Sequence, residues 1–347
     1  MTANPALGVF LHAIGGLAAA SFYVPNKRVK GWTWEGYWLT QGIVSWIIAP
    51  IVGGLITIPA LWTVISGAPP TNLFWSYFFG FLWGIGGLTF GLSMRYLGLS
   101  LGYALALGFT MAFGTIVPPL VEGDPAKLLT AGGLITLGGV AVALAGVAVS
   151  CFAATLKDKE LTTAEKRAAI VEFALTKGVG VAIFSGIMSA CMAYGLDAGK
   201  PIAAAAVKAG ADDLYKNNAV LVVVLLGGFT SNCIWCLYLM ARNRGKNKPE
   251  EKPTPLPNFL LAALGGTLWY LQFFFYGMGT TRLGQYNFAS WTIHMSFIIV
   301  FSTLWGFAFK EWSGVSKRTL WTVIGGIAVL IASTAVIGYG NWIAASK

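Results

Sequence analysis

Two histidines provide most of the acid–base chemistry available inside the apolar part of this sequence. His12 and His294 are the only histidines of the chain, and each lies within a long apolar segment. An imidazole titrates near neutral pH, so it can take up and release a proton under physiological conditions. Asp197, at the end of another apolar segment, adds a carboxyl group. These three residues are candidates for carrying a proton, although a lone buried histidine also serves as an ordinary hydrogen-bonding group.

Other chemical motifs in the sequence are incomplete. Cys233 and Cys236 have the spacing of a metal or redox motif, but no second Cys or His pair lies near them, so we interpret them as buried, inert thiols. Gly84–Gly87 lacks the preceding strand and following acidic residue of a dinucleotide-binding loop. The sequence contains no metal, nucleophile–base or Walker pattern. We therefore predict that the chain is not an enzyme, has no cofactor or metal, and does not use ATP directly.

The composition indicates an integral membrane protein. Of 347 residues, 56% are hydrophobic and only 10% are charged, against roughly 25% charged in a soluble domain, and the mean hydropathy is +0.70. A soluble, disordered or disulfide-stabilised protein is excluded. The net charge of +10 sits in short loops between apolar blocks, without the aromatic-interleaved basic face of a nucleic-acid-binding protein.

The lengths of the apolar runs predict an all-α fold with ten transmembrane helices. A helix needs about 20 residues to cross a hydrocarbon core ~30 Å thick, and no run alternates like a β-barrel strand. The predicted spans are residues 6–24, 37–59, 72–92, 99–119, 131–153, 178–197, 218–240, 257–278, 287–309 and 319–341. Only Met94–Gly98 separates the third span from the fourth.

The basic residues predict the orientation of the chain. Residues 1–24 have no basic region before their apolar run, so we expect a retained first helix rather than a signal peptide. Loops after the odd-numbered spans hold 17 of the 23 Lys and Arg residues, and the other side holds 6. The positive-inside rule then puts both termini outside the cell.

Two loops have a distinct composition. Residues 155–177 contain a capping box at Thr162–Glu165, which predicts a short interfacial helix between the two halves. Residues 242–258 form a charged, Pro-rich linker.

The two halves of the chain resemble each other. The matching segments are Leu82–Gly98 with Leu268–Gly284, shifted by 186 residues with one gap, Gly138–Val142 with Gly325–Val329, shifted by 187, and Gly16 and Ser21 with Gly186 and Cys191, shifted by 170. Five helices per half is an odd number, so the second half enters the membrane inverted. We predict a first repeat over residues 1–154, a connecting loop over 155–177 and an inverted second repeat over 178–347, which is an architecture of secondary transporters.

Several longer strings resemble one family. The sequence is similar to the bacterial L-rhamnose–proton symporters of the drug/metabolite transporter superfamily at Phe22–Glu35, Trp83–Gly86, Met94–Gly98, Trp269–Tyr276, Ser290–Phe297 and Lys310–Trp312. The resemblance is collinear from about residue 8 to residue 340. It implies alternating-access uptake of L-rhamnose or a related deoxyhexose with protons, ten helices in the bacterial inner membrane, and no cofactor.

The chain departs from the family pattern at two positions. It reads Gln285-Tyr286-Asn287 where the family carries Gln-Tyr-Asp, and it has Asp197 where the family carries Asn. One carboxylate is lost and another is gained. The departures leave the coupling group and the identity of the sugar open.

Given this resemblance, the polar and aromatic residues inside the spans are the candidates for sugar contact, because buried polar groups in a membrane are costly unless they have a function. Gln272 can both donate to and accept from sugar hydroxyls, or it forms a helix–helix hydrogen bond. Tyr276 lies one turn further along the same face, and Tyr270 lies nearby; otherwise both are packing aromatics. Trp83 matches Trp269 in the repeat, which also fits a structural role.

Asn287, Trp291 and His294 share one face of the ninth predicted span, and we expect them to line the transport pathway. His294 is the first candidate for the coupling proton because it shares that face with Trp291. His12 is the second, and we expect it to lie farther from the sugar. Asp197 is the third, because a carboxyl at a span end is solvated and titrates near ~4.

Four charged residues near the span ends are candidates for gating. Arg95 and Arg282 correspond in the repeat, and the alternative is that they anchor helix ends at the membrane surface. Lys27 and Glu35 lie between the first two spans, where the alternative to gating is a surface charge cluster at the cytoplasmic mouth.

Two other function classes stay open. The chain could export or facilitate diffusion of another small polar metabolite, or it could be a membrane-embedded enzyme or sensor, for which the sequence offers no catalytic constellation. We expect the partners to be a small-molecule sugar, the proton and membrane lipid, with no nucleic acid, and we expect a monomer.

Overall fold

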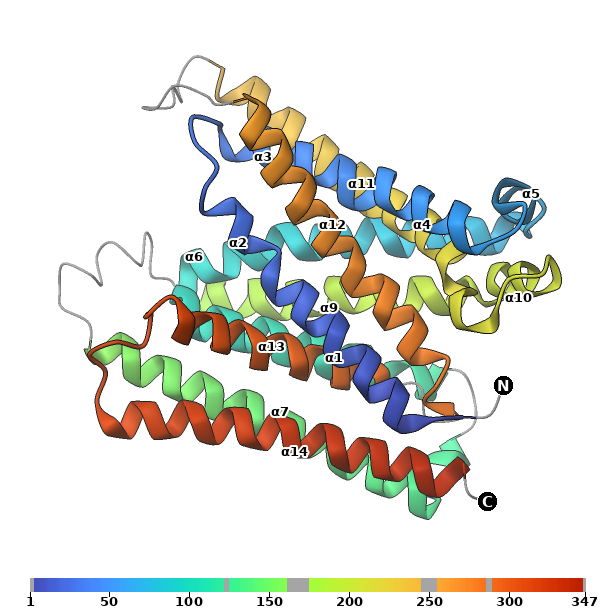
Figure 1. Cartoon of the computed structure of the whole chain (residues 1–347). Helices are drawn as coiled ribbons and strands as arrows, with labels where there is room; N and C mark the ends of the chain where they lie inside the picture. The colour runs from blue at the N-terminus through green and yellow to red at the C-terminus, as the bar shows by residue number, and fades with distance from the viewer. Residues whose placement is uncertain (1–2, 122–124, 161–174, 245–254, 285–288, 346–347) are drawn as a thin grey trace. The chain divides into compact units, whose positions relative to one another are not determined.

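A computed structural model of the chain describes residues 3–121, 125–160, 175–244, 255–284 and 289–345. Over these ranges the chain is helical and contains no β-strand. The α-helices are α1 (Pro5–Ser21), α2 (Tyr23–Asn26), α3 (Trp34–Ile43), α4 (Ala49–Thr57), α5 (Leu61–Ser66), α6 (Pro70–Val121), α7 (Ala131–Glu160), α9 (Leu175–Ala198), α10 (Lys200–Lys208), α11 (Asn217–Arg242), α12 (Pro255–Thr280), α13 (Ser290–Ala308) and α14 (Lys317–Ala345) (Figure 1). A π-helical turn η1 (Val44–Ile48) joins α3 to α4, and η2 (Pro125–Leu129) and η3 (Asp213–Tyr215) are short 3₁₀ turns.

Nine helical runs in the described part of the chain are long and apolar enough to cross a membrane. They are Pro5–Asn26, Trp34–Thr57, Pro70–Ser93, Ala131–Lys157, Thr176–Lys208, Asp213–Arg242, Pro255–Thr280, Ser290–Ala308 and Lys317–Ala344. Each overlaps one predicted span, so the prediction of an all-α, multi-pass membrane protein is confirmed. The remaining predicted span, 99–119, overlaps a shorter apolar helix, Leu105–Val117.

The prediction of a break between the third and fourth spans is wrong as stated. The backbone is helical throughout Met94–Gly98, within the single element α6. The physical reason is that this segment contains no proline and only one glycine, so nothing in it removes a backbone donor or favours leaving the helix. The predicted interfacial helix at Thr162–Glu165 lies outside the described residues, as does most of the Pro-rich linker.

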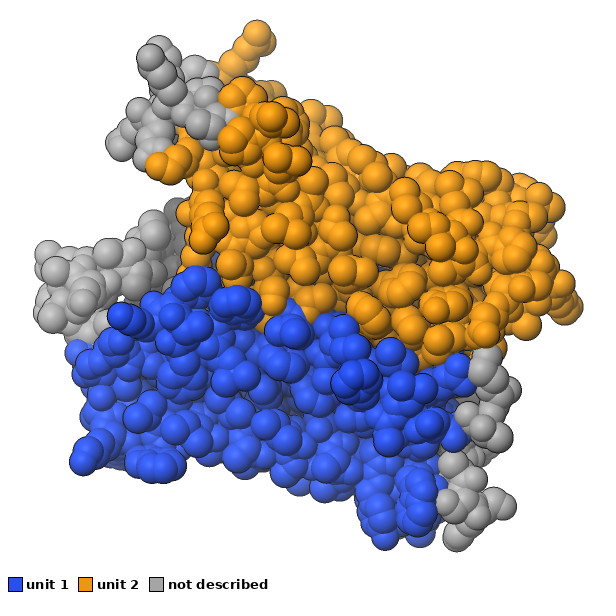
Figure 2. Space-filling model, in the orientation of Figure 1, with its two compact units in different colours: residues 1–17, 86–193, 279–347 blue, residues 18–85, 194–278 orange. Residues whose placement is uncertain are grey.

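The chain forms two compact units, each assembled from distant segments (Figure 2). Unit 1 comprises residues 1–17, 86–193 and 279–347, and unit 2 comprises residues 18–85 and 194–278. Both units therefore take helices from both predicted halves of the sequence. Four helices, α1, α6, α9 and α12, begin in one unit and end in the other.

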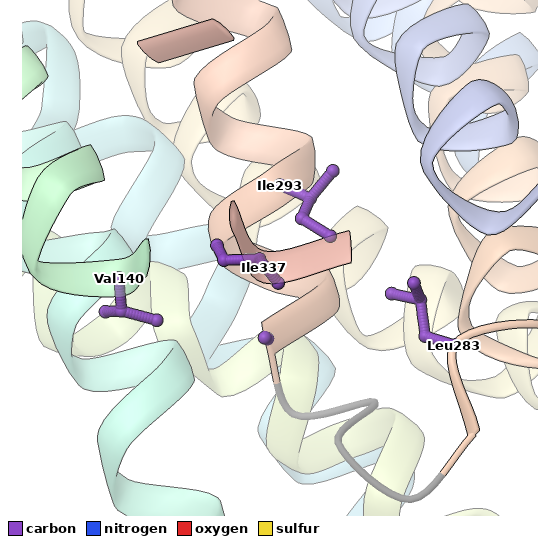
Figure 3. Packing of buried hydrophobic residues seen from close by; sticks show 5 residues of the cluster. Val140, Leu283, Ile293 and Ile337 are labelled. Atoms are coloured by element: carbon purple, nitrogen blue, oxygen red, sulfur yellow. The ribbon is translucent and has the colours of Figure 1, made fainter. Parts of the chain in front are cut away.

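In unit 1, α7 and α14 lie side by side and run in opposite directions (Figure 1). Glycines make this close approach possible: a Cβ at Gly139 would lie 3.0 Å from the backbone nitrogen of Ile337, and one at Gly326 would lie 3.1 Å from that of Ser150. Small residues at such contacts are typical of membrane helices. Next to this pair, α13 contributes Ile293 to a buried cluster with Val140, Leu283, Ala289 and Ile337 (Figure 3).

The last residue of α7 also holds the start of α14. The Glu160 carboxylate accepts hydrogen bonds from the Ser316 backbone N–H at 2.7 Å, from the Ser316 hydroxyl at 2.6 Å and from the Thr319 hydroxyl at 2.6 Å. A carboxylate is favoured at a helix N-terminus, where backbone N–H groups lack intrahelical partners. These hydrogen bonds hold the pKa of Glu160 below its ordinary value.

In unit 2, the π-helical turn between α3 and α4 carries Trp46. Pro50 has no backbone N–H to donate to the carbonyl of Trp46 four residues earlier. The chain widens by one residue before it, and the N–H of Ala49 donates to the carbonyl of Val44, five residues back. Single π turns of this kind are frequent at functional sites.

Candidate functional site

The structure brings the two histidines together in unit 1. The ring centroids of His12 on α1 and His294 on α13 lie 6.0 Å apart, with the ring planes inclined by 60°. Both side chains are fully buried. A Cβ at Gly279 would lie 2.8 Å from two atoms of the His12 ring, so α12 can pass this imidazole only because that position has no side chain. Sequence analysis treated the two histidines as alternatives, and it did not predict that they are neighbours.

Trp291 connects the histidine pair to α6. Its indole N–H donates to the carbonyl of Thr110 at 3.1 Å, its ring packs on Gly114, and its centroid lies 6.5 Å from that of His294. A second bond between α6 and α13 joins the hydroxyls of Thr115 and Thr292 at 2.7 Å. The shared face of Trp291 and His294 is thus confirmed as a buried one. Asn287, the third predicted member of that face, lies outside the described residues.

A cluster of tryptophans forms the centre of unit 2. Trp46, Trp83 and Trp269 contact one another, with ring centroids 5.2 Å apart for Trp46 and Trp269 and 5.3 Å apart for Trp83 and Trp269. Phe273 lies 5.5 Å from Trp83 and 5.3 Å from Trp269, and Phe22 lies 6.0 Å from Trp269. We call these five residues the aromatic cluster. Trp83 and Trp269 were singled out from the sequence, but Trp46 was not.

Two polar groups beside the aromatic cluster have no hydrogen-bond partner among the described residues. They are the indole N–H of Trp46 and the hydroxyl of Tyr270. Both side chains are 4% exposed. The Tyr270 ring packs against Gly53 of α4, where a Cβ would lie 2.9 Å from its Cζ atom. An unpaired buried donor or acceptor is costly, so these two groups mark a place where a polar ligand would restore lost hydrogen bonds.

The other predicted sugar-contacting residues lie on the same helix. Gln272 and Tyr276 of α12 are both buried, at 6% and 4% exposure. Nearby polar groups that the sequence analysis missed are already paired: Tyr37 donates its hydroxyl hydrogen to the side-chain oxygens of Asn26 and Gln41, and Trp38 donates its indole N–H to Asn232 at 3.0 Å. A pattern of small polar residues facing aromatics across several spans was the only sequence signal for them.

The predicted gating residues lie in several places. Lys27 is exposed, as expected, but Glu35 is only 5% exposed and accepts a hydrogen bond from the Asn243 side chain at 2.8 Å. The expectation that both belong to a surface charge cluster is therefore wrong for Glu35. The reason is local: the Thr33 hydroxyl accepts from the Gly36 N–H and starts α3 there, which puts Glu35 in the first helical turn, where Asn243 reaches it.

The remaining predicted charges lie near helix ends. Arg282 follows α12, and its backbone carbonyl accepts from the N–H of Asn4, just before α1. The side chain of Arg95, within α6, is not among those described. Asp197, in the last turn of α9, is 37% exposed and forms an ion pair with Lys200. The expectation that Asp197 is solvated is confirmed.

Comparison with known proteins assigns the chain to a family. The family model described as "L-rhamnose-proton symport protein (RhaT)" matches residues 1–344. Curated relatives named L-rhamnose-proton symporter are 39% identical in Shigella dysenteriae and 38% identical in Shigella boydii and Escherichia coli, each over 96% of this chain and 97% of the relative. The chain belongs to the RhaT family. The resemblance noted in the sequence is thereby confirmed.

RhaT family membership settles the functional class. The family and these relatives are symport proteins, so the predictions of a transporter rather than an enzyme are confirmed. A symporter must bind two species, a solute and a coupling ion, and their binding must be linked. Unit 1 of this RhaT family member contains a buried pair of ionisable rings, and unit 2 contains a buried aromatic cluster with unpaired polar groups.

Proposed function

We propose that this protein imports L-rhamnose, or a closely related deoxyhexose, together with protons by alternating access. The proposal is supported by the names of its relatives, which share 38–39% identity over nearly their full length. We further propose the bacterial inner membrane as its location, both termini outside, a monomeric state, and membership of the drug/metabolite transporter superfamily. The 17-to-6 division of Lys and Arg supports the orientation.

We propose ten transmembrane helices in two inverted repeats. The nine candidate spans and the shorter Leu105–Val117 support the number. Two contacts between α7 and α14 support the repeat: a shift of 187 residues carries Gly139 to Gly326 and Ser150 to Ile337, so the contact of Gly139 with Ile337 has its counterpart in that of Gly326 with Ser150. Equivalent helices that run antiparallel are what an inverted repeat requires.

We propose that the sugar binds at the aromatic cluster of unit 2. The observation that carries this proposal is the pair of buried, unpartnered polar groups, the Trp46 N–H and the Tyr270 O–H, beside three tryptophan rings. A tryptophan ring offers a flat apolar face to the C–H side of a sugar, and the two polar groups offer hydrogen bonds to its hydroxyls. A deoxyhexose suits such a site because its methyl group replaces one hydroxyl.

The other predicted residues complete the proposal. Gln272 and Tyr276 share a helix with Tyr270 and would contact hydroxyls, and Trp83 would stack. Trp291 and Asn287 would line the pathway in the part of α13 and its approach that belongs to unit 1. Because the Trp291 N–H already donates to Thr110, only the ring face of Trp291 remains for contact with a sugar. Lys27, Glu35, Arg95 and Arg282 would act in gating.

The function is tested by proton movement in de-energised membrane vesicles that contain the protein. Adding L-rhamnose should make the external medium more alkaline, because each sugar enters with a proton. A panel of hexoses and deoxyhexoses, with vesicles lacking the protein as the control, defines the specificity. Sugar entry without alkalinisation would contradict proton symport, and an unresponsive panel would contradict sugar import.

A further inference from the structure

Two helix crossings in unit 1 are built in the same way. Where α1 meets α13, a Cβ at Gly16 would lie 3.0 Å from the carbonyl carbon of Phe297 and 3.1 Å from the next backbone nitrogen. Where α9 meets α6, a Cβ at Gly186 would lie 3.0 Å from the carbonyl carbon of Phe109 and 3.0 Å from the next backbone nitrogen. Each crossing thus seats a glycine on the backbone of a phenylalanine.

The two crossings are related by the internal repeat. A shift of 170 residues carries Gly16 to Gly186, and a shift of 188 carries Phe109 to Phe297. The same two shifts carry His12 to position 182 and position 106 to His294. The residues at 182 and 106 are alanines, both fully buried and packed in one cluster with Phe90, Leu105 and Val179.

The crossings therefore differ at one pair of positions. One is closed by two alanines and the other by two histidines, one helical turn from the glycine–phenylalanine contact in each case. Two alanines suffice to pack this geometry, so packing alone does not require the imidazoles. Burying two polar rings in a membrane helix crossing is unfavourable unless the rings have a function.

We infer that His12 and His294 together form the proton-binding site of the symporter. This inference rests on the proposed function, proton-coupled import, and identifies where the coupling proton binds. One proton binds a nitrogen of one imidazole from the outside and leaves to the inside, and no covalent bond is made or broken. Two positive rings with centroids 6.0 Å apart in a buried site repel each other, so the pair holds one proton at a time.

The surroundings contain few competing groups. Neither α1, α13 nor the Leu105–Val117 segment of α6 has an Asp, Glu, Lys or Arg in its sequence. On α12, the position facing His12 is Gly279, and Arg282 follows the helix end. The helices α7 and α14, which pack beside α13, carry their charges in one end turn each, at Lys157–Glu160 and at Lys317 and Arg318; α14 also carries Tyr339 near its other end.

Linkage between the proton and the sugar does not require contact between them. If the protonated histidine pair and the sugar-loaded aromatic cluster both favour the same state of the transport cycle, each increases affinity for the other by the same factor. Trp291 lies 6.5 Å from His294 and is held on α6 through Thr110, so a shift between α13 and α6 changes the surroundings of the proton site directly.

The test is the double variant H12A/H294A, which copies the alanine pair of the equivalent crossing. L-Rhamnose binding to the purified full chain is measured by calorimetry across a pH series, and sugar counterflow is measured in proteoliposomes. For the natural chain, we expect Kd to rise by about tenfold per pH unit above the titration of the site, as linkage to one proton requires. In the double variant, we expect Kd to vary less than about twofold over the same range, with counterflow retained. M192L, a buried change on α9, should behave like the natural chain.

The outcomes separate the inference from the proposed function. If the double variant keeps the pH dependence of Kd, the proton binds elsewhere and the inference is wrong. If the natural chain binds L-rhamnose without pH dependence and moves no protons, the proposed function itself is wrong. If the double alanine variant is not recovered from the membrane, H12Q/H294Q, which keeps hydrogen-bonding groups, is judged by the same two results.

Discussion

Replacing Tyr270 with phenylalanine separates sugar binding from folding, because the two should change in opposite directions. The Tyr270 hydroxyl is buried and has no hydrogen-bond partner within the described structure. Removing an unpaired buried polar group from the sugar-free protein removes a desolvation cost of about 1–3 kcal/mol. The sugar-free Y270F protein should therefore be more stable than the natural chain. Its apparent melting temperature in detergent should rise.

Sugar affinity should fall in the same variant. A hydrogen bond between neutral groups contributes about 0.5–1.5 kcal/mol net, which corresponds to a roughly two- to tenfold increase in Kd for L-rhamnose. Calorimetry on the purified protein measures this change. The matched control is Y77F in the same unit, whose hydroxyl donates to Thr230 at 2.9 Å. Y77F should lower stability by about 1 kcal/mol and leave Kd unchanged. An unchanged Kd in Y270F would refute the assignment of Tyr270 to the sugar site.

Three further predictions concern particular contacts. Q272A should weaken L-rhamnose binding at least tenfold (about 1.4 kcal/mol) without lowering expression, since sugar hydroxyls left unpaired in a buried site are costly, and an unchanged Kd would assign Gln272 to helix packing. Glu160 has a lowered pKa because Ser316 and Thr319 donate to its carboxylate, so it stabilises the fold above the ordinary carboxyl pKa and loses that effect as the pH falls through its lowered value; melting curves of E160Q and the natural chain should converge at acidic pH, and a constant difference would argue against this. G16A should lower stability by about 1–3 kcal/mol, because the new Cβ would lie 2.5 Å from the Cβ of Phe297, whereas G325A, where a Cβ meets no atom within 4 Å, should not.

The membrane spans could be predicted closely from the sequence. A hydrocarbon core dictates the length of an apolar helix, and charged or Pro-rich segments mark where it ends. The predicted span 131–153 thus corresponds to Ala131–Lys157, and 257–278 to Pro255–Thr280. The exception is Met94–Gly98, where a charged residue was interpreted as a break and the backbone remains helical.

The contacts of the candidate site could be predicted only in part. Spacing along one helix identified Trp291 with His294, because a helix has a fixed repeat. The pairing of His12 with His294 could not be predicted, since they lie on α1 and α13, far apart in the sequence, and only the packing of these helices joins them. The position of Trp46 depends on the π turn before Pro50, and the burial of Glu35 depends on Asn243 from α11. Neither has a signal in a single sequence.

The most direct test of the central claim is accumulation of L-rhamnose by proteoliposomes that contain only this protein. With the interior more alkaline than the exterior, radiolabelled L-rhamnose should rise inside above its external concentration, and a protonophore should abolish the rise. Proton-coupled import predicts this accumulation, since the inward proton gradient drives the sugar uphill. Equilibration to the external concentration, unaffected by the protonophore, would contradict it and indicate a facilitator instead.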